Sequence, residues 1–420
     1  MYQRTLLPNG LRLVTSKMSH THSVTVGFFI GAGSRYETDA QAGGSHFIEH
    51  LCFKGAERRR SAKEISEAIE GVGGILNGGT DRELTVYWCK VARPHFPLAL
   101  DVLVDMLRHS TFNPEEIEKE RKVILEEINM MLDSPPQLVD ALIDEVVWPN
   151  QPLGRDVAGT KESVSALTRN DLLDYMGHQY VPNNLVVSVA GNISHHEVKE
   201  AIGAALGDWT EHPTGKWYPA EDEQDTPRLR LISKKTEQVH LCLAFRGLSN
   251  LHPDRFVLDI LNVILGEGMS SRLFLELREK RGLAYDVHSY VSHFRDSGST
   301  TIYAGVDPGN TKATIQALLD ELKRLREDIP AAEVTKAKEL SKGRLLLRME
   351  DTRSVASWMG AQELLTGRIL TVDEVVNIVD SITVEDLLRV AGQLLVTGKL
   401  NLALVGPLRS EKQYQSLLKL

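Results

Sequence analysis

The stretch TRNDLLDYM at residues 168–176 returns 215 positions later as TVEDLLRVA at 383–391 (383 − 168 = 215). Each copy opens with a threonine that can cap a helix, and an aspartate three residues later completes a capping box. At the same offset, LVVSVAG at 185–191 corresponds to LNLALVG at 400–406, in both cases a strand-like run that ends in glycine. The chain therefore contains an internal repeat, which decides its domain organisation.

Both copies alternate strand-like runs with amphipathic helices. Runs such as SVTVGFFI at 23–30 and VHLCLAF at 239–245 favour a mainly antiparallel sheet. We therefore predict an α+β fold of two similar domains, each a mainly antiparallel sheet with helices packed on one face. The predicted domains are residues 1–215 and 228–420, and the polar, proline-containing segment 216–227 is the predicted linker.

Length and composition are those of a globular protein with more than one domain. The 420 residues exceed the size at which one hydrophobic core keeps growing, and 42% of them are hydrophobic. A formal net charge of −9 argues against a nucleic-acid partner, because phosphate binding depends on clustered Lys and Arg. The one basic run, at 58–60, precedes a helix start and is interpreted as a solvated loop.

The sequence favours the cytoplasm of a bacterium as the location. The first residues lack the apolar stretch of a signal peptide, and no run of eighteen apolar residues suggests a membrane span. Cys52, Cys89 and Cys242 have no CxxC spacing and would leave one cysteine unpaired in any disulfide scheme. We expect three reduced thiols and no membrane partner.

A cluster of titratable groups stands out in GGSHFIEHLCFKG at 43–55. His46, Glu49 and His50 occupy positions i, i+3 and i+4, so a helix projects all three side chains from one face. Two imidazoles one turn apart can bind one zinc ion. The order His-x-x-Glu-His reverses the thermolysin-type motif and matches the inverzincin pattern, in which the glutamate is the general base.

The second copy lacks this cluster. Adding 215 to 46, 49 and 50 gives Leu261, Ile264 and Leu265, all apolar. A helix that only packs can carry leucine at these positions, so the fold itself does not require the polar residues of the first copy. This difference favours a functional site in the first copy alone.

A catalytic zinc site normally has three protein ligands, so a third must come from elsewhere in the chain. The segment EIEKERKVILEEIN at 116–129 reads as a helix with carboxylates at helical spacing. Glu120 and Glu127 are seven residues apart and share one face of it. Either carboxylate could meet the two histidines.

These motifs resemble the zinc metallopeptidase family of pitrilysin, insulin-degrading enzyme and mitochondrial processing peptidase, and most closely its short bacterial members. In that family the third ligand follows the second histidine by 77 positions (127 − 50 = 77), which selects Glu127 over Glu126. Glu120 matches a second acidic residue that the family keeps near the metal. The resemblance therefore places Glu120 among the catalytic residues, as a supporting group. The resemblance implies a duplicated fold like that of LuxS and processing peptidase, and one Zn²⁺ per chain.

Two further segments extend the resemblance. GGILNGGTDRELTVY at 73–87 is similar to the family's edge strand beside the metal, with Asn77 as a substrate-binding residue. An exposed strand edge can hold an extended peptide by main-chain hydrogen bonds. The family more often has alanine after the asparagine, whereas this chain has glycine at 78 and 79, which leaves a simple bulge as the alternative.

In the second copy, LREKRGLAY at 277–285 resembles the family's Arg and Tyr pair, seven residues apart. Arg278 is expected to clamp a substrate carbonyl, and Tyr285 to donate to the oxyanion that develops on the scissile carbonyl.

The function that the resemblance implies is a zinc-dependent endopeptidase. We expect it to hydrolyse unfolded peptides or oligopeptides in a chamber formed between two domains or two chains. The expected assembly is a homodimer, or a heterodimer with a homologue that lacks ligands. The alternative is a non-catalytic assembly subunit of a processing-peptidase-like complex, and a metal-dependent hydrolase of a non-peptide substrate is a weaker third.

Overall fold

A computed structural model of the protein describes residues 2–420. They form two compact units. The first unit consists of the residues up to Ile128, Asp156–Tyr218 and Leu346–Thr371. The second unit consists of Asn129–Arg155, Pro219–Leu345 and Val372–Leu420.

The first unit is built on a six-stranded sheet, with strand order β1-β2-β6-β3-β5-β4. The strands are β1 (Tyr2–Leu6), β2 (Arg12–Lys17), β3 (Ser23–Ile30), β4 (Ile75–Thr80), β5 (Thr85–Ala92) and β6 (Leu185–Gly191). Only β2 and β6 pair in parallel. Because β4 ends the order, one of its edges is free of strand pairing within this sheet.

The second unit repeats this arrangement with five strands in the order β7-β11-β8-β10-β9. They are β7 (Arg228–Ser233), β8 (Val239–Arg246), β9 (Ala284–His293), β10 (Gly298–Val306) and β11 (Asn401–Gly406). Again one pair, β7 with β11, is parallel and the other pairs are antiparallel. The mainly antiparallel sheets of the predicted α+β fold are confirmed.

The helices of the first unit cover one face of its sheet and enclose the core. They are α1 (Gly44–Cys52), α2 (Ala62–Glu70), α3 (Phe96–Arg108), α4 (Pro114–Asp133), α6 (Lys161–Ala166), α7 (Arg169–Gln179) and α8 (His195–Leu206). The last residues of α4 belong to the second unit. Inward side chains of β3, such as Val24, Val26 and Phe28, are fully buried against them.

The second unit has the corresponding set of helices. They are α9 (Arg255–Gly266), α10 (Thr311–Glu327), α11 (Ala331–Arg348), α13 (Val372–Ser381), α14 (Val384–Leu394) and α15 (Lys412–Gln415), together with a π-helical segment, Phe274–Lys280. The predicted capping boxes are present at α7 and α14, where Thr168 with Asp171 and Thr383 with Asp386 bond reciprocally. The repeat read from the sequence is therefore a repeat of structure.

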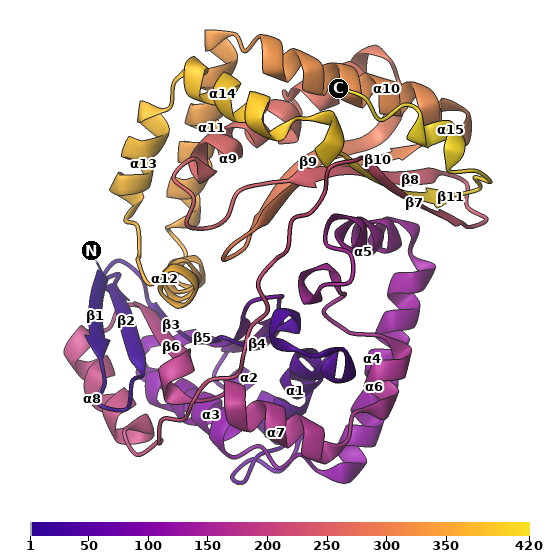
Figure 1. Cartoon of the computed structure of the whole chain (residues 1–420). Coiled ribbons are helices and arrows are strands. Elements are labelled where there is room, and N and C mark those ends of the chain that lie inside the picture. The colour runs from indigo at the N-terminus through magenta and orange to yellow at the C-terminus, as the bar shows by residue number, and fades with distance from the viewer. Residues whose placement is uncertain (1) are drawn as a thin grey trace. The chain divides into compact units, whose positions relative to one another are not determined.

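Each sheet also carries one helix on its other face, and that helix comes from the opposite half of the chain. Helix α12 (Thr352–Thr366) packs on β3 and β6 in the first unit, and α5 (Pro135–Val147) packs on β8 and β11 in the second (Figure 1). The sequence-based division at 215 and 228 follows the duplicated chain. The compact units differ from it because they exchange these two helical segments.

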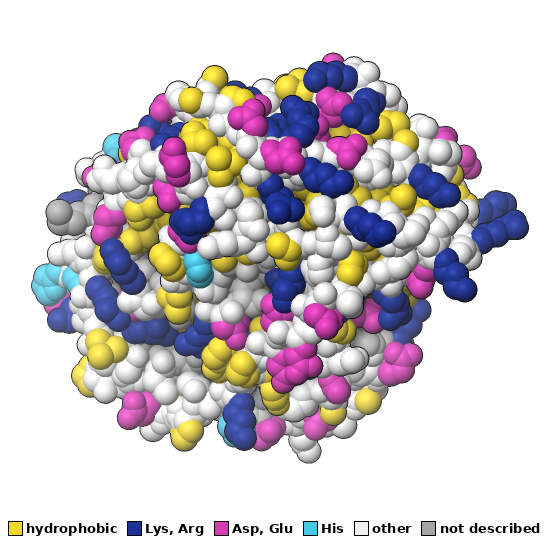
Figure 2. All heavy atoms as spheres, turned by 45° about the horizontal axis from the view of Figure 1, so that its top comes forward, with side chains coloured by type: hydrophobic (Ala, Val, Ile, Leu, Met, Phe, Trp, Pro, Cys, Tyr) yellow, Lys and Arg dark blue, Asp and Glu magenta, His cyan; other side chains and the backbone are white. Residues whose placement is uncertain are grey.

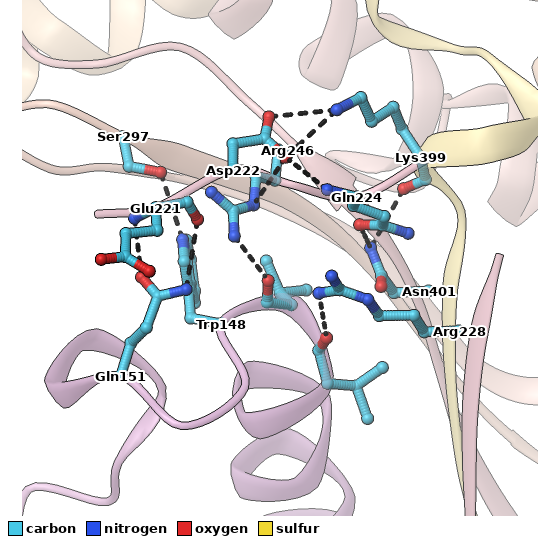
Figure 3. Close-up of polar contacts among 12 residues, drawn as sticks. Trp148, Gln151, Glu221, Asp222, Gln224, Arg228, Arg246, Ser297, Lys399 and Asn401 are labelled. Carbon is cyan, nitrogen blue, oxygen red and sulfur yellow. Dashed lines mark hydrogen bonds and ion pairs between the residues drawn. The ribbon is translucent and has the colours of Figure 1, made fainter. Parts of the chain in front are cut away.

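Polar contacts fix the C-terminal end of α5 within the second unit (Figure 3). Arg246 Nη2 donates to the carbonyl of Val147 at 3.1 Å, and Arg228 Nη1 donates to that of Val146 at 3.4 Å. These carbonyls belong to the last turn, where a helix leaves its acceptors without internal partners. Just beyond the helix, Trp148 Nε1 donates to Ser297 Oγ at 3.2 Å.

The surface mixes the two signs of charge. On the face that Figure 2 shows, Lys and Arg side chains lie among Asp and Glu, with small apolar areas between them. The three cysteines are free and buried. Among residues 2–420, no helix combines the length and the apolar character that a membrane span requires.

Candidate metal centre

Helix α1 begins at a backbone position that favours glycine. Gly43 has φ of 89°, and a Cβ there would lie 2.5 Å from the carbonyl oxygen of Ala158. The buried carboxylate of Glu37 accepts hydrogen bonds from the amides of Gly43 and Ser45, at 2.8 and 2.7 Å. A negative charge at a helix N-terminus satisfies free amides there and is stabilised by the helix dipole. The start of α1 is therefore fixed.

One face of α1 enters the core and the other carries the predicted site. The buried apolar residues are Phe47, Ile48, Leu51 and Cys52. The opposite face presents His46, Glu49 and His50, which are all partly exposed. Packing of the apolar face therefore sets the direction in which the two imidazoles point.

The structure brings the three predicted ligands together. Nε2 of His46 lies 3.2 Å from Nε2 of His50, and Oε2 of Glu127 on α4 lies 3.7 Å from each. Among residues 2–420, these three form the one group of three or more His, Cys, Asp or Glu side chains whose ligand atoms all lie within 4.8 Å of one another.

The donor set fits a zinc ion. Ligand atoms about 2.0–2.1 Å from a tetrahedral ion lie about 3.3 Å apart, close to the observed separations. Burial and the neighbouring His50 lower the pKa of His46 to about 4, so at neutral pH this imidazole is uncharged and can offer a lone pair. Nε2 of His46 faces the other two ligand atoms, so this nitrogen would hold the ion, while Nδ1 is buried without a hydrogen-bond partner among the described residues.

A second contact sets the tautomer of His50. Its Nδ1 lies 3.1 Å from Oε2 of the buried Glu120, and Oε1 of Glu120 lies 2.8 Å from the ammonium of Lys54. Because a carboxylate accepts, Nδ1 carries the proton and Nε2 keeps its lone pair. Glu120 therefore acts on His50 and not directly on the space that faces the three ligand atoms.

Glu49 lies beside the ligands and is held from the neighbouring strand. Its Oε2 accepts a hydrogen bond from Oγ1 of Thr80 on β4, at 2.5 Å. Burial raises the pKa of Glu49 above its ordinary value, although the hydrogen bond from Thr80 and the nearby His50 work in the opposite direction. A carboxyl group with a raised pKa is suited to accept and return a proton near neutral pH.

Strand β4 is an edge strand next to α1, as the resemblance predicted for the segment with Asn77. Asn77 is exposed, and its Oδ1 accepts from the amide of Gly78 at 2.8 Å. The pairing of β4 with β5 runs without a register shift from Ile75 to Thr80. The interpretation of Gly78 and Gly79 as a bulge is therefore wrong.

Arg278 and Tyr285 lie together in the second unit. The Arg278 guanidinium is 4.4 Å from the centre of the Tyr285 ring and 4.9 Å from that of Phe274. Tyr285 is 74% exposed, and Arg278 lies in the π-helical segment, a type of irregularity that is frequent at functional sites. Their predicted contacts with substrate stay predictions.

Three residues around the centre were not among the predicted site residues. Lys54 follows His50 by four positions, so helical spacing could have identified it as a neighbour. Glu37 and Thr80 have no such local signal, because their contacts with α1 depend on how a loop and a strand pack against it.

Comparisons with known proteins identify the family. The family model described as "Insulinase (Peptidase family M16)" matches residues 12–161, and that of the "Peptidase M16 inactive domain" matches residues 166–341. An uncharacterized zinc protease of Bacillus subtilis is 39% identical over 97% of this chain and 98% of its own length. One from Streptomyces coelicolor is 38% identical over 98% of this chain and 90% of its own length.

Solved structures share the fold. A protease from Helicobacter pylori superposes with a TM-score of 0.91 at 23% identity, covering 96% of this chain and 99% of that one. A chain of complex III2 from Candida albicans reaches 0.86 at 21% identity, with both chains fully covered. With matching models for both halves and relatives above 30% identity over nearly the full length, the chain belongs to peptidase family M16, the insulinase family of zinc peptidases and related proteins.

Proposed function

We propose that this protein is a zinc-dependent endopeptidase that hydrolyses unfolded peptides or oligopeptides. The observation that carries the proposal is the convergence of His46, His50 and Glu127 within 4.8 Å, with the Glu49 carboxylate beside them. The zinc proteases among the relatives support the same metal, and one Zn²⁺ per chain is proposed.

Each protein group has a distinct task in the proposed reaction. When bound, zinc acts as a Lewis acid that lowers the pKa of water towards about 7 and polarises a carbonyl group. Glu49 accepts a proton at its carboxylate from the attacking water molecule. As the peptide C–N bond breaks, Glu49 returns that proton to the amine nitrogen that leaves. The free edge of β4 can align an extended peptide by main-chain hydrogen bonds.

A non-catalytic assembly role is the second candidate. The likeness to a chain of complex III2 and the match of the second half to an inactive-domain model favour it. The first half argues for the enzyme, because an assembly subunit has no use for three converging ligands with a carboxylate beside them. The proposed dimer, identical or with a ligand-deficient homologue, is tested by the native mass.

The substitution Glu49→Gln tests the proposal. The amide keeps the size of the carboxylate and can still contact Thr80, but it cannot take a proton. We expect one zinc per chain by elemental analysis and a fall in the cleavage of a peptide mixture of about 10²–10⁴-fold. Undiminished cleavage by the variant would remove Glu49 as the base.

A second comparison separates the two candidates. Zinc-loaded wild-type protein that cleaves no member of a broad peptide mixture, in the absence of chelator, would favour the assembly role. Cleavage that a chelator abolishes and added zinc restores is the expected result.

A further inference from the structure

Strand β4 presents alternate residues to α1, and Thr80 is the one that reaches the proposed base. Side chains alternate along a strand, so Leu76, Gly78 and Thr80 face the same way. Leu76 packs against the apolar core, while the Thr80 hydroxyl lies 2.5 Å from Oε2 of Glu49. The contact crosses from the sheet to the helix, between residues 31 positions apart in the chain.

The hydrogen bond leaves the two carboxylate oxygens of Glu49 in different settings. Oε2 is bonded to Thr80, and Oε1 points towards Gly78, where an added Cβ would lie 3.1 Å away. That Cβ would also lie 3.0 Å from the ring of Phe53. Glycine at 78 thus leaves room for Oε1, and the threonine fixes Oε2.

The Thr80 hydroxyl has one further contact, with Oγ1 of Thr85 at 3.5 Å, but Thr85 donates to the carbonyl of Ala32 at the shorter distance of 3.1 Å. Pairing of β4 with β5 uses backbone groups, with Thr80 opposite Thr85 at the end of the ladder. Valine has nearly the same shape and is likewise favoured in strands. A hydroxyl at this position is therefore explained by its contact with Glu49 and not by the strand.

Without this contact, the Glu49 side chain would be free to turn. A glutamate has three rotatable bonds, and fixing them costs conformational entropy. A catalytic group is effective only when it is held within about 0.5 Å of its productive position. A single short hydrogen bond from a rigid strand can supply that restraint.

We propose that Thr80 is a positioning residue, whose hydroxyl holds the Glu49 carboxylate so that Oε1 faces the reacting water and the leaving amine. The inference rests on the proposed peptidase function. Strand β4 would then have two roles, because it would align the substrate and also orient the proposed base Glu49.

The test compares Thr80→Val with Thr80→Ser in zinc-loaded full-length protein. Valine removes the hydroxyl and keeps the shape, whereas serine keeps the hydroxyl. We expect kcat on a peptide to fall about 10–100-fold in Thr80→Val, with KM and zinc content unchanged, and to recover largely in Thr80→Ser.

Thr25→Val is the matched control. Thr25 is a buried threonine of β3 whose hydroxyl bonds that of Thr352 at 2.9 Å, on the face of the sheet that α12 covers. Its loss should lower the midpoint of thermal unfolding and leave kcat unchanged. An equal kcat in Thr80→Val and wild type would overturn the inference, and so would equal defects in Thr80→Val and Thr80→Ser.

Crystal structures of zinc-loaded wild type and Thr80→Val give a readout that needs no activity. The Glu49 carboxylate should leave its position in the variant, and an unmoved carboxylate would refute the positioning role. If the wild type cleaves no peptide, the proposed function fails, whereas the position of Glu49 in the two structures still decides the role of Thr80.

Discussion

Helices α1 and α9 hold equivalent positions in the two units, yet α1 carries the predicted metal ligands on one face and α9 is apolar and buried at the corresponding positions. Where α1 has His46 and His50, α9 has Leu261 and Leu265, which are 3% and 2% exposed and line a small apolar cavity of about 10 Å³. A helix at this place in the repeat can therefore pack with leucine at both positions. His46 of α1 leaves its Nδ1 buried without a hydrogen-bond partner among the described residues, whereas the leucines of α9 need no partner.

The difference extends to the second helix of each site. Aligning the buried Ile117 of α4 with the buried Val334 of α11 gives an offset of 217 (334 − 117 = 217), which relates Glu127 to Arg344 (127 + 217 = 344). The repeat offset of 215 relates Glu127 to Lys342 (127 + 215 = 342), which is also a cation. Arg344 pairs with Glu267 in the second unit. A cation thus replaces the third ligand, so the second unit lacks both parts of the donor set.

The largest expected effect comes from making α1 resemble α9. In His46→Leu with His50→Leu, two of the three ligands are gone, so we expect no zinc in the purified protein and no peptide cleavage. The zinc-free variant should be about 1–3 kcal/mol less stable than the zinc-free wild type, because Oε2 of the buried Glu120 loses its partner on His50, although leucine itself suits a helix. Elemental analysis and thermal unfolding with chelator measure both outcomes. Retention of one zinc per chain would contradict the ligand assignment.

The reverse exchange should cost stability and yield no metal site. Leu261→His with Leu265→His places two imidazoles in an apolar core, where a polar group without a partner costs about 1–3 kcal/mol. We expect roughly 2–5 kcal/mol of destabilisation and no zinc uptake, since α11 offers a guanidinium in place of a carboxylate. The control, Leu261→Met with Leu265→Met, keeps the volume and should cost far less. Zinc binding by the histidine variant would show that the third ligand is dispensable.

The repeat explains why much of the fold was predictable. Capping boxes and strand ends are local features, so the equivalence of α7 with α14 and of β6 with β11 can be read from short stretches. The exchange of α5 and α12 has no such signal, because an amphipathic helix does not encode which sheet it will cover. The division of the chain into compact units depends on that exchange.

The residues of the candidate metal centre also differ in how far the sequence predicts them. His46 and His50 are related by helical spacing, which the sequence displays directly. Glu127 is 77 positions further on and was selected by resemblance, since helical spacing left Glu120 open as well. Thr80 contacts Glu49 only because β4 packs beside α1. This tertiary contact has no local sequence pattern that would predict it.

A smaller effect on zinc binding is expected from Lys54, which contacts Glu120 and through it His50. Lys54→Met removes the ammonium that holds Oε1 of Glu120, so the other oxygen should orient His50 less firmly. We expect zinc affinity to fall about 10–100-fold, measured by competition with a chromogenic chelator. Lys63→Met is the control, because Lys63 is exposed and pairs with Glu67 on the surface of α2. Equal zinc affinity in Lys54→Met and Lys63→Met would show that Lys54 is not required for Glu120 to orient His50.

The smallest effect concerns an imidazole that the second unit does keep near α9. Nε2 of His293 lies 3.1 Å from Oδ1 of Asp259, and Nδ1 lies 2.6 Å from the carbonyl of Leu248. Burial works to lower the pKa of His293, but the hydrogen bond and charge of Asp259 outweigh it, so the pKa is raised. His46 in the first unit shows the opposite shift, as a neutral metal ligand requires.

The raised pKa of His293 fixes the direction of its pH dependence. The stabilisation is fully present below the unfolded pKa of about 6.5 and is lost as the pH rises through the higher folded value. In Asp259→Asn we therefore expect a lower unfolding midpoint than wild type at pH 6 and a smaller difference at pH 8. Because Asp259 is 39% exposed, solvent screens the pair and the effect should stay below about 1 kcal/mol. A difference that grows with pH would mean that His293 is neutral in the folded protein, as His46 is, and the contrast between the two imidazoles would be lost.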